Sequence, residues 1–353
     1  MTPQRILFVE LLGGIGDLLF TLPALAAVGT AYPKAWIDVL SFAPGAELLV
    51  GNPRIHQVFF ARRGSGPENQ PACRNDLRAV LARTHYDLII SDTRHSGIHD
   101  LIDQSGATCT VTRLWTGATS DESIPSLFLR RLREEEIIPA TQTAGPSQIF
   151  LSRSERQFAE DVWRQLDLVP ARTIALNPHA GVAVKRWPIA HFVCFGKELV
   201  NAGWQVAVMA ADAPALANEI AQSIPSARVL EKLPLRQTAA WLEKLALLAS
   251  GDSGIAHLAS TLGTPVVAIY GPTGAGRYGV NGTALNLQSP FPCSELNLLN
   301  FTTQRCWFSG QCIHSGKSTC CEDVTPESAL AAARSLLEAT HCKPPAGKTL
   351  VNY

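Results

Sequence analysis

Residues 248–273 constrain the fold of this chain more than any other stretch. An expected strand at 248–250 enters a turn at 251–254, a short helical segment follows, and an apolar run at 265–269 ends in a loop. Strand, glycine turn, helix and strand in this order are typical of a parallel α/β sheet. The turn also leaves backbone N–H groups at the start of a helix, which is a favourable place for an anion.

Two side chains at the rim of this turn add chemistry to it. Asp252 lies in the turn, and His257 lies one turn into the following helix. The phosphates of a nucleotide sugar need hydrogen-bond donors, and its hydroxyls need an acceptor such as a carboxylate. The stretch therefore favours a nucleotide-sugar donor.

The rest of the chain repeats the same alternation in two halves. Expected strands lie at 5–12, 36–41, 86–91, 173–177 and 205–210, and expected helices at 17–28, 76–84, 152–166, 188–202 and 214–223. The small, polar stretch 140–147 is a candidate linker. We expect an α/β protein with two Rossmann-like doubly wound domains that face a cleft at the carboxyl ends of their strands.

The expected domains are residues 1–150 and 151–330, with a C-terminal helix and tail at 325–353. Thr325 is the expected N-cap of that helix, and Pro326 its first residue.

Composition excludes several classes of protein. The 353 residues are 46% hydrophobic and carry 30 Lys and Arg against 30 Asp and Glu, so a nucleic-acid partner is not expected. There is no run of 18 apolar residues, and the N-terminus leads directly into a strand, not a signal-peptide pattern. We expect a cytoplasmic protein.

Most of the nine cysteines lie in the last quarter of the chain: Cys293, Cys306, Cys312, Cys320, Cys321 and Cys342. Reduced thiols, a metal clip and redox-dependent pairing are all compatible with this distribution. No C-x-x-C pair occurs, although His314 between two of the cysteines leaves zinc open. The sequence predicts no metal site.

Several motifs occur together and in a definite order. They are Gly13-Gly14-Ile15-Gly16-Asp17, Thr21-Leu22-Pro23-Ala24-Leu25, Lys185-Arg186-Trp187-Pro188, Gly251-Asp252-Ser253-Gly254 with His257, and Tyr270-Gly271-Pro272-Thr273. In this ordered set the chain resembles the ADP-heptose:lipopolysaccharide heptosyltransferase-like family, glycosyltransferase family 9. The resemblance implies a GT-B type fold, inverting sugar transfer without an obligatory metal or cofactor, and an acceptor held mainly by the N-terminal half.

The resemblance assigns the catalytic base to Asp17. Inverting transfer needs a base that takes the proton of the acceptor hydroxyl as this attacks the anomeric carbon. The alternative is an N-cap aspartate, and a helix N-terminus favours the carboxylate, which lowers its basicity. Gly13, Gly14 and Gly16 would let the backbone approach the sugar, although turn formation alone also explains glycines here.

The resemblance places the donor on the second half. Lys185 would neutralise the departing diphosphate, and Glu231 would bind the vicinal ribose hydroxyls; solvated surface charges are the alternative for both. Asp252 would lie near the donor sugar, or it simply forms the turn.

The remaining donor-binding candidates are Ser253, Gly254 and His257, the histidine as a phosphate or a structural contact. The loop at 177–184 lacks the Ser or Thr pair that often precedes the lysine in this family. The identity of the donor base therefore stays open.

Three other functions fit this sequence less well. A dinucleotide-dependent oxidoreductase would need a glycine at position 19 to complete the pattern that Gly14 and Gly16 begin. Leu19 occupies that position. A sugar-nucleotide epimerase would need acid and base groups on both faces of the sugar. A non-catalytic sugar-nucleotide-binding protein is disfavoured because Asp17 and Lys185 are both present.

The predicted function is inverting transfer of heptose from ADP-heptose to a lipopolysaccharide core or another cell-envelope saccharide. A glycolipid acceptor would be presented at the inner face of the membrane. The family therefore suggests peripheral contact with that membrane.

Overall fold

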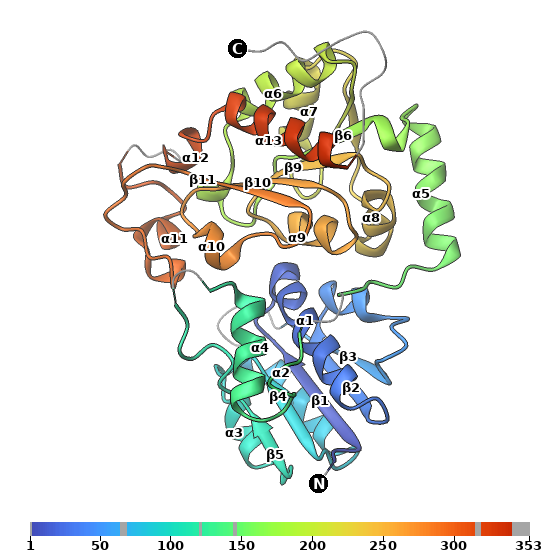
Figure 1. Cartoon of the computed structure of the whole chain (residues 1–353), viewed down its shortest axis with the longest axis vertical. Coiled ribbons are helices and arrows are strands. Elements are labelled where there is room, and N and C mark those ends of the chain that lie inside the picture. Colours follow the sequence, from blue (N-terminus) through green and yellow to red (C-terminus); the bar gives the residue numbers. More distant parts are fainter. Residues whose placement is uncertain (1, 64–68, 120–121, 144–146, 315–318, 341–353) are drawn as a thin grey trace. The chain divides into compact units, whose positions relative to one another are not determined.

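The chain consists of two compact units, Met1–Phe150 and Leu151–Tyr353. The computed structural model describes residues 2–63, 69–119, 122–143, 147–314 and 319–340 (Figure 1). The expected linker at 140–147 and the expected C-terminal tail lie partly outside the described residues, as does Cys342.

The N-terminal unit is built on a five-stranded parallel sheet with the order β3-β2-β1-β4-β5. Its strands are β1 (Arg5–Glu10), β2 (Trp36–Phe42), β3 (Gln57–Ala61), β4 (Leu88–Ser91) and β5 (Cys109–Val111). The chain leaves β1 toward β2 on one side and returns to β4 on the other. The carboxyl ends of β1 and β4 therefore form a topological switch point, the usual ligand site of such sheets.

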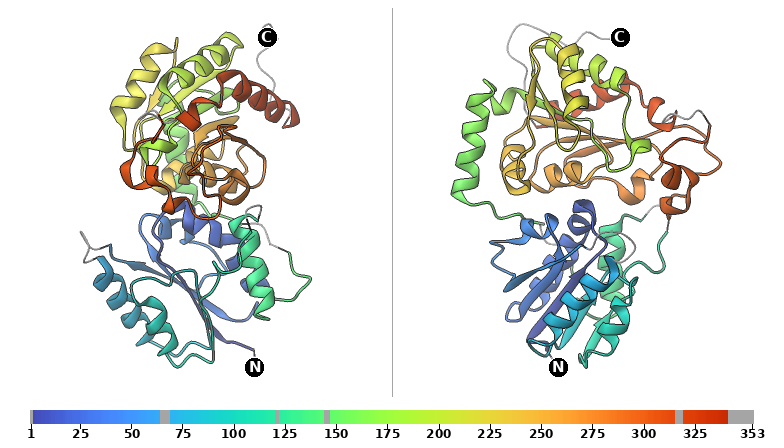
Figure 2. Two further views of the ribbon diagram at one scale, coloured as in Figure 1. Left: turned by 90° about the vertical axis from the view of Figure 1, so that its left-hand side faces the viewer. Right: turned by 180° about the vertical axis from the view of Figure 1, so that it is seen from behind.

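Helices cover both faces of this sheet. They are α1 (Ile15–Ala31), α2 (Asn69–Leu81), α3 (Ile98–Asp103) and α4 (Ile124–Glu134), with the 3-10 turn η1 (Gly45–Leu49). Figure 2 shows α2 and α3 on one side of the sheet and α4 on the other. A buried apolar cluster that includes Leu7, Leu40 and Leu77 covers the face toward α2 and α3, and β1 and β2 are buried along nearly their whole length.

The C-terminal unit has a six-stranded parallel sheet with the order β11-β10-β9-β6-β7-β8. Its strands are β6 (Thr173–Asn177), β7 (Gln205–Met209), β8 (Arg228–Leu230), β9 (Leu247–Gly251), β10 (Val266–Tyr270) and β11 (Ala284–Gln288). Here the switch point lies between β6 and β9.

The longer helices of this unit are α5 (Arg153–Gln165), α6 (Ile189–Asn201), α7 (Pro214–Ser223), α8 (Leu235–Leu242), α9 (Gly254–Thr261) and α13 (Pro326–Ala339). Shorter ones are α10 (Ala275–Tyr278), α11 (Arg305–Ser309), α12 (Thr319–Glu322), η2 (Pro170–Arg172), η3 (Ala183–Lys185) and η4 (Phe301–Thr303). In Figure 1, α6, α7 and α13 lie along one face of the sheet, and α8 and α9 along the other. One buried cluster, with Phe195 and Leu247 among its members, joins the sheet to α6, α7 and α13.

The predicted α/β class is confirmed, and so are most of the expected elements. The helix expected near the C-terminus begins as predicted: Thr325 accepts from the Ser328 N–H at 3.3 Å, and Pro326 is the first helical residue. Within the described part of the chain, no helix is both long enough and apolar enough to span a bilayer.

Candidate functional site

The switch point of the C-terminal sheet gathers polar side chains around the start of α9. Asn177, at the end of β6, donates from its amide to the hydroxyls of Ser250 (2.9 Å) and Ser253 (3.1 Å). The Ser253 hydroxyl in turn accepts from the Ala256 N–H and caps α9. These bonds fix the turn that the sequence singled out, at the edge where ligands bind in parallel sheets.

Lys185 and Asp252 form an ion pair at this turn. The Lys185 ammonium lies 2.8 Å from Asp252 Oδ2, and the Thr273 hydroxyl donates to the same oxygen at 2.7 Å. Lys185 also lies over the ring of Phe301, 4.2 Å from its centroid. The predicted phosphate-binding lysine thus contacts an acid and an aromatic ring, and the Thr273 hydroxyl holds that acid.

Close packing explains one glycine of the motif. A Cβ at Gly251 would lie 2.8 Å from the backbone carbonyl oxygen of Lys185, which cannot move away as a flexible side chain could. Glycine at this position therefore lets the 183–185 loop approach β9 and brings the lysine to the turn.

His257 is buried behind the turn, with 7% of its surface exposed. Burial lowers its pKa to about 4; the negative charge of Asp252 opposes this shift, and the positive charge of Lys185 adds to it. The imidazole is accordingly neutral at neutral pH. A neutral, buried ring agrees better with the structural alternative for His257 than with a cationic phosphate ligand.

Glu231 follows β8, as predicted, and is exposed. β8 is the outermost strand on its side of the sheet, and β7 and β6 lie between it and β9. Glu231 therefore lies at the carboxyl ends of the strands, as Lys185 does, but outside the cluster around Asp252.

The glycine loop of the N-terminal unit lies at the other switch point. Gly14 is the N-cap of α1, and its N–H donates to Asp17 Oδ2 at 2.9 Å. Asp17 is therefore not the N-cap itself: it lies in the first turn, and its side chain bonds back to the cap residue. Gly13 adopts φ +112°, where a side chain would be strained and would meet the Arg63 guanidinium.

Two buried carboxyl groups beside this loop escaped the sequence analysis. Glu10 ends β1 and Asp92 follows β4, and they are only 1% and 2% exposed. Burial raises the pKa of each, and the charge of Asp17 raises it further. An acid at the carboxyl end of an apolar strand was the signal that could have found them.

Arg63 was also not predicted. Its guanidinium lies over the ring of Phe42, 4.6 Å from the centroid, and donates to the Gly13 carbonyl. This places an exposed cation on the glycine loop. Its signal in the sequence was weak, because an arginine after a short edge strand is common on protein surfaces.

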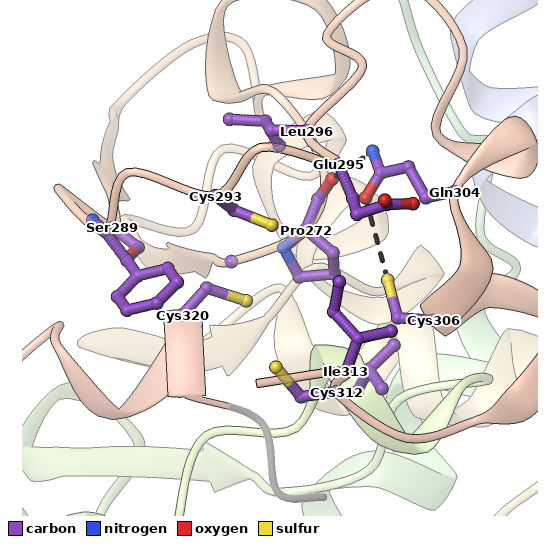
Figure 3. A pocket seen from close by; sticks show the side chains of 13 residues that line it. Pro272, Ser289, Cys293, Glu295, Leu296, Gln304, Cys306, Cys312, Ile313 and Cys320 are labelled. Atoms are coloured by element: carbon purple, nitrogen blue, oxygen red, sulfur yellow. Dashed lines mark hydrogen bonds between the residues drawn. The ribbon is translucent and has the colours of Figure 1, made fainter. Parts of the chain in front are cut away.

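The cysteine-bearing segment closes a small cavity of about 30 Å³. Cys293, Cys306, Cys312 and Cys320 all line it (Figure 3). They carry free thiols, and burial together with the neighbouring thiols raises the pKa of Cys306. Among the residues that the structure describes, no group of three His, Cys, Asp or Glu side chains is arranged to hold a metal ion.

Comparison with known proteins agrees with this geometry. Residues 134–296 match the model of glycosyltransferase family 9 (heptosyltransferase). Lipopolysaccharide heptosyltransferase 1 of Pseudomonas aeruginosa is 26% identical over 310 residues, which cover 82% of this chain and 85% of that protein. The resemblance to glycosyltransferase family 9 is confirmed.

Solved structures extend the likeness in fold to nearly the whole chain. A glycosyl transferase family 9 protein from Veillonella parvula superposes with a TM-score of 0.79 at 19% identity, covering 95% of this chain and 98% of that one. The ADP-heptose lps heptosyltransferase II of E. coli gives a TM-score of 0.68 at 20% identity, covering 96% and 99%. The match to the family model includes Lys185, Glu231 and the 251–257 turn, whereas Asp17 lies before it.

Proposed function

We propose that this family 9 homologue is an inverting glycosyltransferase that takes its sugar from a nucleoside diphosphate donor. The observation that carries this proposal is the ion pair of Lys185 and Asp252 at the β6/β9 switch point. The ammonium of Lys185 would bind phosphate, and the carboxylate of Asp252 would accept hydrogen bonds from hydroxyl groups. The donor would lie on the C-terminal unit.

Lys185 would act on the leaving group. Negative charge builds on the diphosphate as the bond to the anomeric carbon breaks, and an ammonium group already fixed beside it stabilises that charge. The backbone N–H groups at the start of α9, which Ser253 caps, would add donors of the kind that bind phosphate. Glu231 would receive the ribose hydroxyls, and Asp252 a hydroxyl of the donor sugar.

Asp17 would act as the base toward the acceptor. It lies in the first turn of α1, directly after the glycine loop at the switch point of the N-terminal sheet. Its carboxylate would take the proton of the attacking hydroxyl as that oxygen bonds to the anomeric carbon, and the nucleoside diphosphate would leave.

We further propose ADP-heptose as the donor and a saccharide of the lipopolysaccharide core as the acceptor. The names of the relatives support this choice: one is a lipopolysaccharide heptosyltransferase, and another is described as acting with ADP-heptose. An acceptor of this class is part of a glycolipid, so the protein would meet it at the inner membrane surface. Sedimentation with acceptor-bearing vesicles tests that contact, and failure to sediment would contradict it.

A thermal-shift panel of ADP, UDP, GDP, CMP and NAD tests the donor class. Ligand at about 100 times its Kd stabilises a protein by about 2.7 kcal/mol, which shifts the melting temperature by several degrees. We expect ADP to stabilise the protein and Lys185→Ala or Glu231→Ala to reduce the effect. Lys244→Ala is the matched control, because Lys244 is an exposed lysine that pairs with Glu160. A response to NAD alone would contradict the proposal.

A further inference from the structure

Glu10 and Asp92 interact electrostatically at the switch point of the N-terminal sheet, but their hydrogen bonds differ. Glu10 Oε1 accepts from the N–H groups of Leu12 (3.0 Å) and Gly13 (3.3 Å), and Oε2 accepts from the Ser41 hydroxyl at 2.5 Å. Three donors on one carboxyl group favour its ionised form. Burial raises the pKa of Glu10, but these bonds make it better suited than Asp92 to hold a negative charge.

Asp92 has less support. Its Oδ1 accepts from the Thr93 hydroxyl at 2.7 Å, while Oδ2 is buried without a hydrogen-bond partner. Ionising a buried carboxyl group that has one oxygen without a hydrogen bond costs free energy. The neighbouring charges of Glu10 and Asp17 increase that cost. Asp92 therefore keeps its proton in the folded protein.

Among the residues that the structure describes, His95, Arg63 and Asp17 also interact with this site. His95, on the loop after β4, hydrogen-bonds the backbone of Leu11. Arg63, on the loop after β3, donates to the Gly13 carbonyl. Asp17 comes from the first turn of α1 and interacts electrostatically with both acids. The N-terminus of α1 and the bond from Gly14 both favour the ionised form of Asp17, which makes it a weak base.

We propose that Glu10 and Asp92 are positioning residues for Asp17: Glu10 accepts from the Gly13 N–H, next to the Gly14 N–H that donates to Asp17, and so brings a negative charge close to the base, while Asp92 fills the site without adding a second one. This inference rests on the proposed function, in which Asp17 is the base. It explains how a carboxylate at a helix N-terminus accepts a proton from a sugar hydroxyl.

The pH dependence of turnover tests the role of Glu10. Rate falls on the acid side as the base becomes protonated. Removing one neighbouring negative charge in Glu10→Gln should move this acid limb down by about one pH unit and lower the plateau rate by about tenfold, because the base is weaker. Asp92→Asn, which imitates a protonated carboxyl, should leave the limb in place.

A matched control is Asp38→Asn, which replaces another buried carboxylate of the same sheet, bonded to Tyr86 at its hydroxyl. It should alter stability without moving the acid limb. If Glu10→Gln turns over donor and its limb coincides with that of the wild type, the inference is wrong while the proposed function stands. If the wild-type protein turns over no nucleotide sugar, the proposed function fails instead.

A stability measurement decides the protonation of Asp92 without any turnover. The folded protein keeps the Asp92 proton, whereas the unfolded chain releases it near pH 4, so wild-type stability falls as pH rises above about 4. Asp92→Asn lacks this loss. The melting temperature of Asp92→Asn relative to wild type should therefore increase from pH 4 to pH 7. A constant or decreasing difference would overturn the assignment.

Discussion

The ion pair of Lys185 and Asp252 offers the sharpest test of the donor-site geometry. At 2.8 Å and an effective dielectric constant near 20, the two charges attract by about 6 kcal/mol, most of which is offset by their desolvation. Their side chains are only 14% and 10% exposed, so the pair is much less screened than a surface salt bridge. Removing one partner from a buried pair typically costs about 3 to 5 kcal/mol.

Lys185→Met removes the ammonium and keeps the aliphatic stem. Asp252 retains the Thr273 hydroxyl, so we expect the lower end of that range, about 3 kcal/mol. For a domain of 150 to 250 residues this corresponds to a melting temperature lower by about 6 to 12 °C.

A double-mutant cycle isolates the pair. Lys185→Met, Asp252→Asn and the double variant are unfolded in urea, and we expect a coupling energy of about 2 kcal/mol. In addition, Asp252→Asn should tighten the binding of ADP, because the released ammonium no longer has to exchange a carboxylate for phosphate. A coupling energy near zero, or weaker ADP binding in Asp252→Asn, would refute this reasoning.

Three further predictions concern the C-terminal unit. His257 has its pKa lowered to about 4, so the unfolded chain binds the extra proton first as pH falls below 6.5; stability should drop by about 3 kcal/mol between pH 7 and pH 4, and His257→Gln should abolish this loss in urea titrations. Gly251→Ala should push the Lys185 backbone away and weaken ADP binding by about tenfold in calorimetry, since small displacements at a site are costly; unchanged binding would contradict the packing argument. Trp187 donates to the Val324 carbonyl at 2.7 Å, so Trp187→Phe should lower the free energy of unfolding by about 1 to 3 kcal/mol, whereas a change below about 0.5 kcal/mol would show that this bond is replaced.

Local patterns predicted the parallel strands and the capped turn well. β6 and α7 have the expected bounds, because an apolar run between polar turns and a proline at a helix start are unambiguous signals. The short edge strands β3, β5 and β11 were not expected. Most of their residues are only partly buried, and β5 and β11 lack a continuous apolar run, so pairing with a neighbour decides their structure.

The candidate site was predictable where a motif lies on one loop and obscure where distant strands meet. Asp252, Ser253 and Gly254 follow one another, and the sequence brought them to attention together. The contacts of Glu10 with Ser41, and of Lys185 with Phe301, join residues that are far apart in the chain. The order of the strands in the sheet brings these residues together, and no periodicity in the local sequence reveals that order.

The cysteines illustrate the same limit. Their spacing left reduced thiols, metal binding and pairing open. The fold brings four of them to one cavity through loops without regular periodicity, so sequence reasoning could not have grouped them.

Transfer of heptose itself tests the central claim most directly. Purified protein is incubated with ADP-heptose and a truncated lipopolysaccharide core acceptor, and ADP release and the anomeric configuration of the product are followed by NMR. We predict stoichiometric ADP and glycoside with inverted configuration from the wild-type protein, and loss of both in Asp17→Asn although ADP still binds. A retained configuration, or full turnover by Asp17→Asn, would contradict the account.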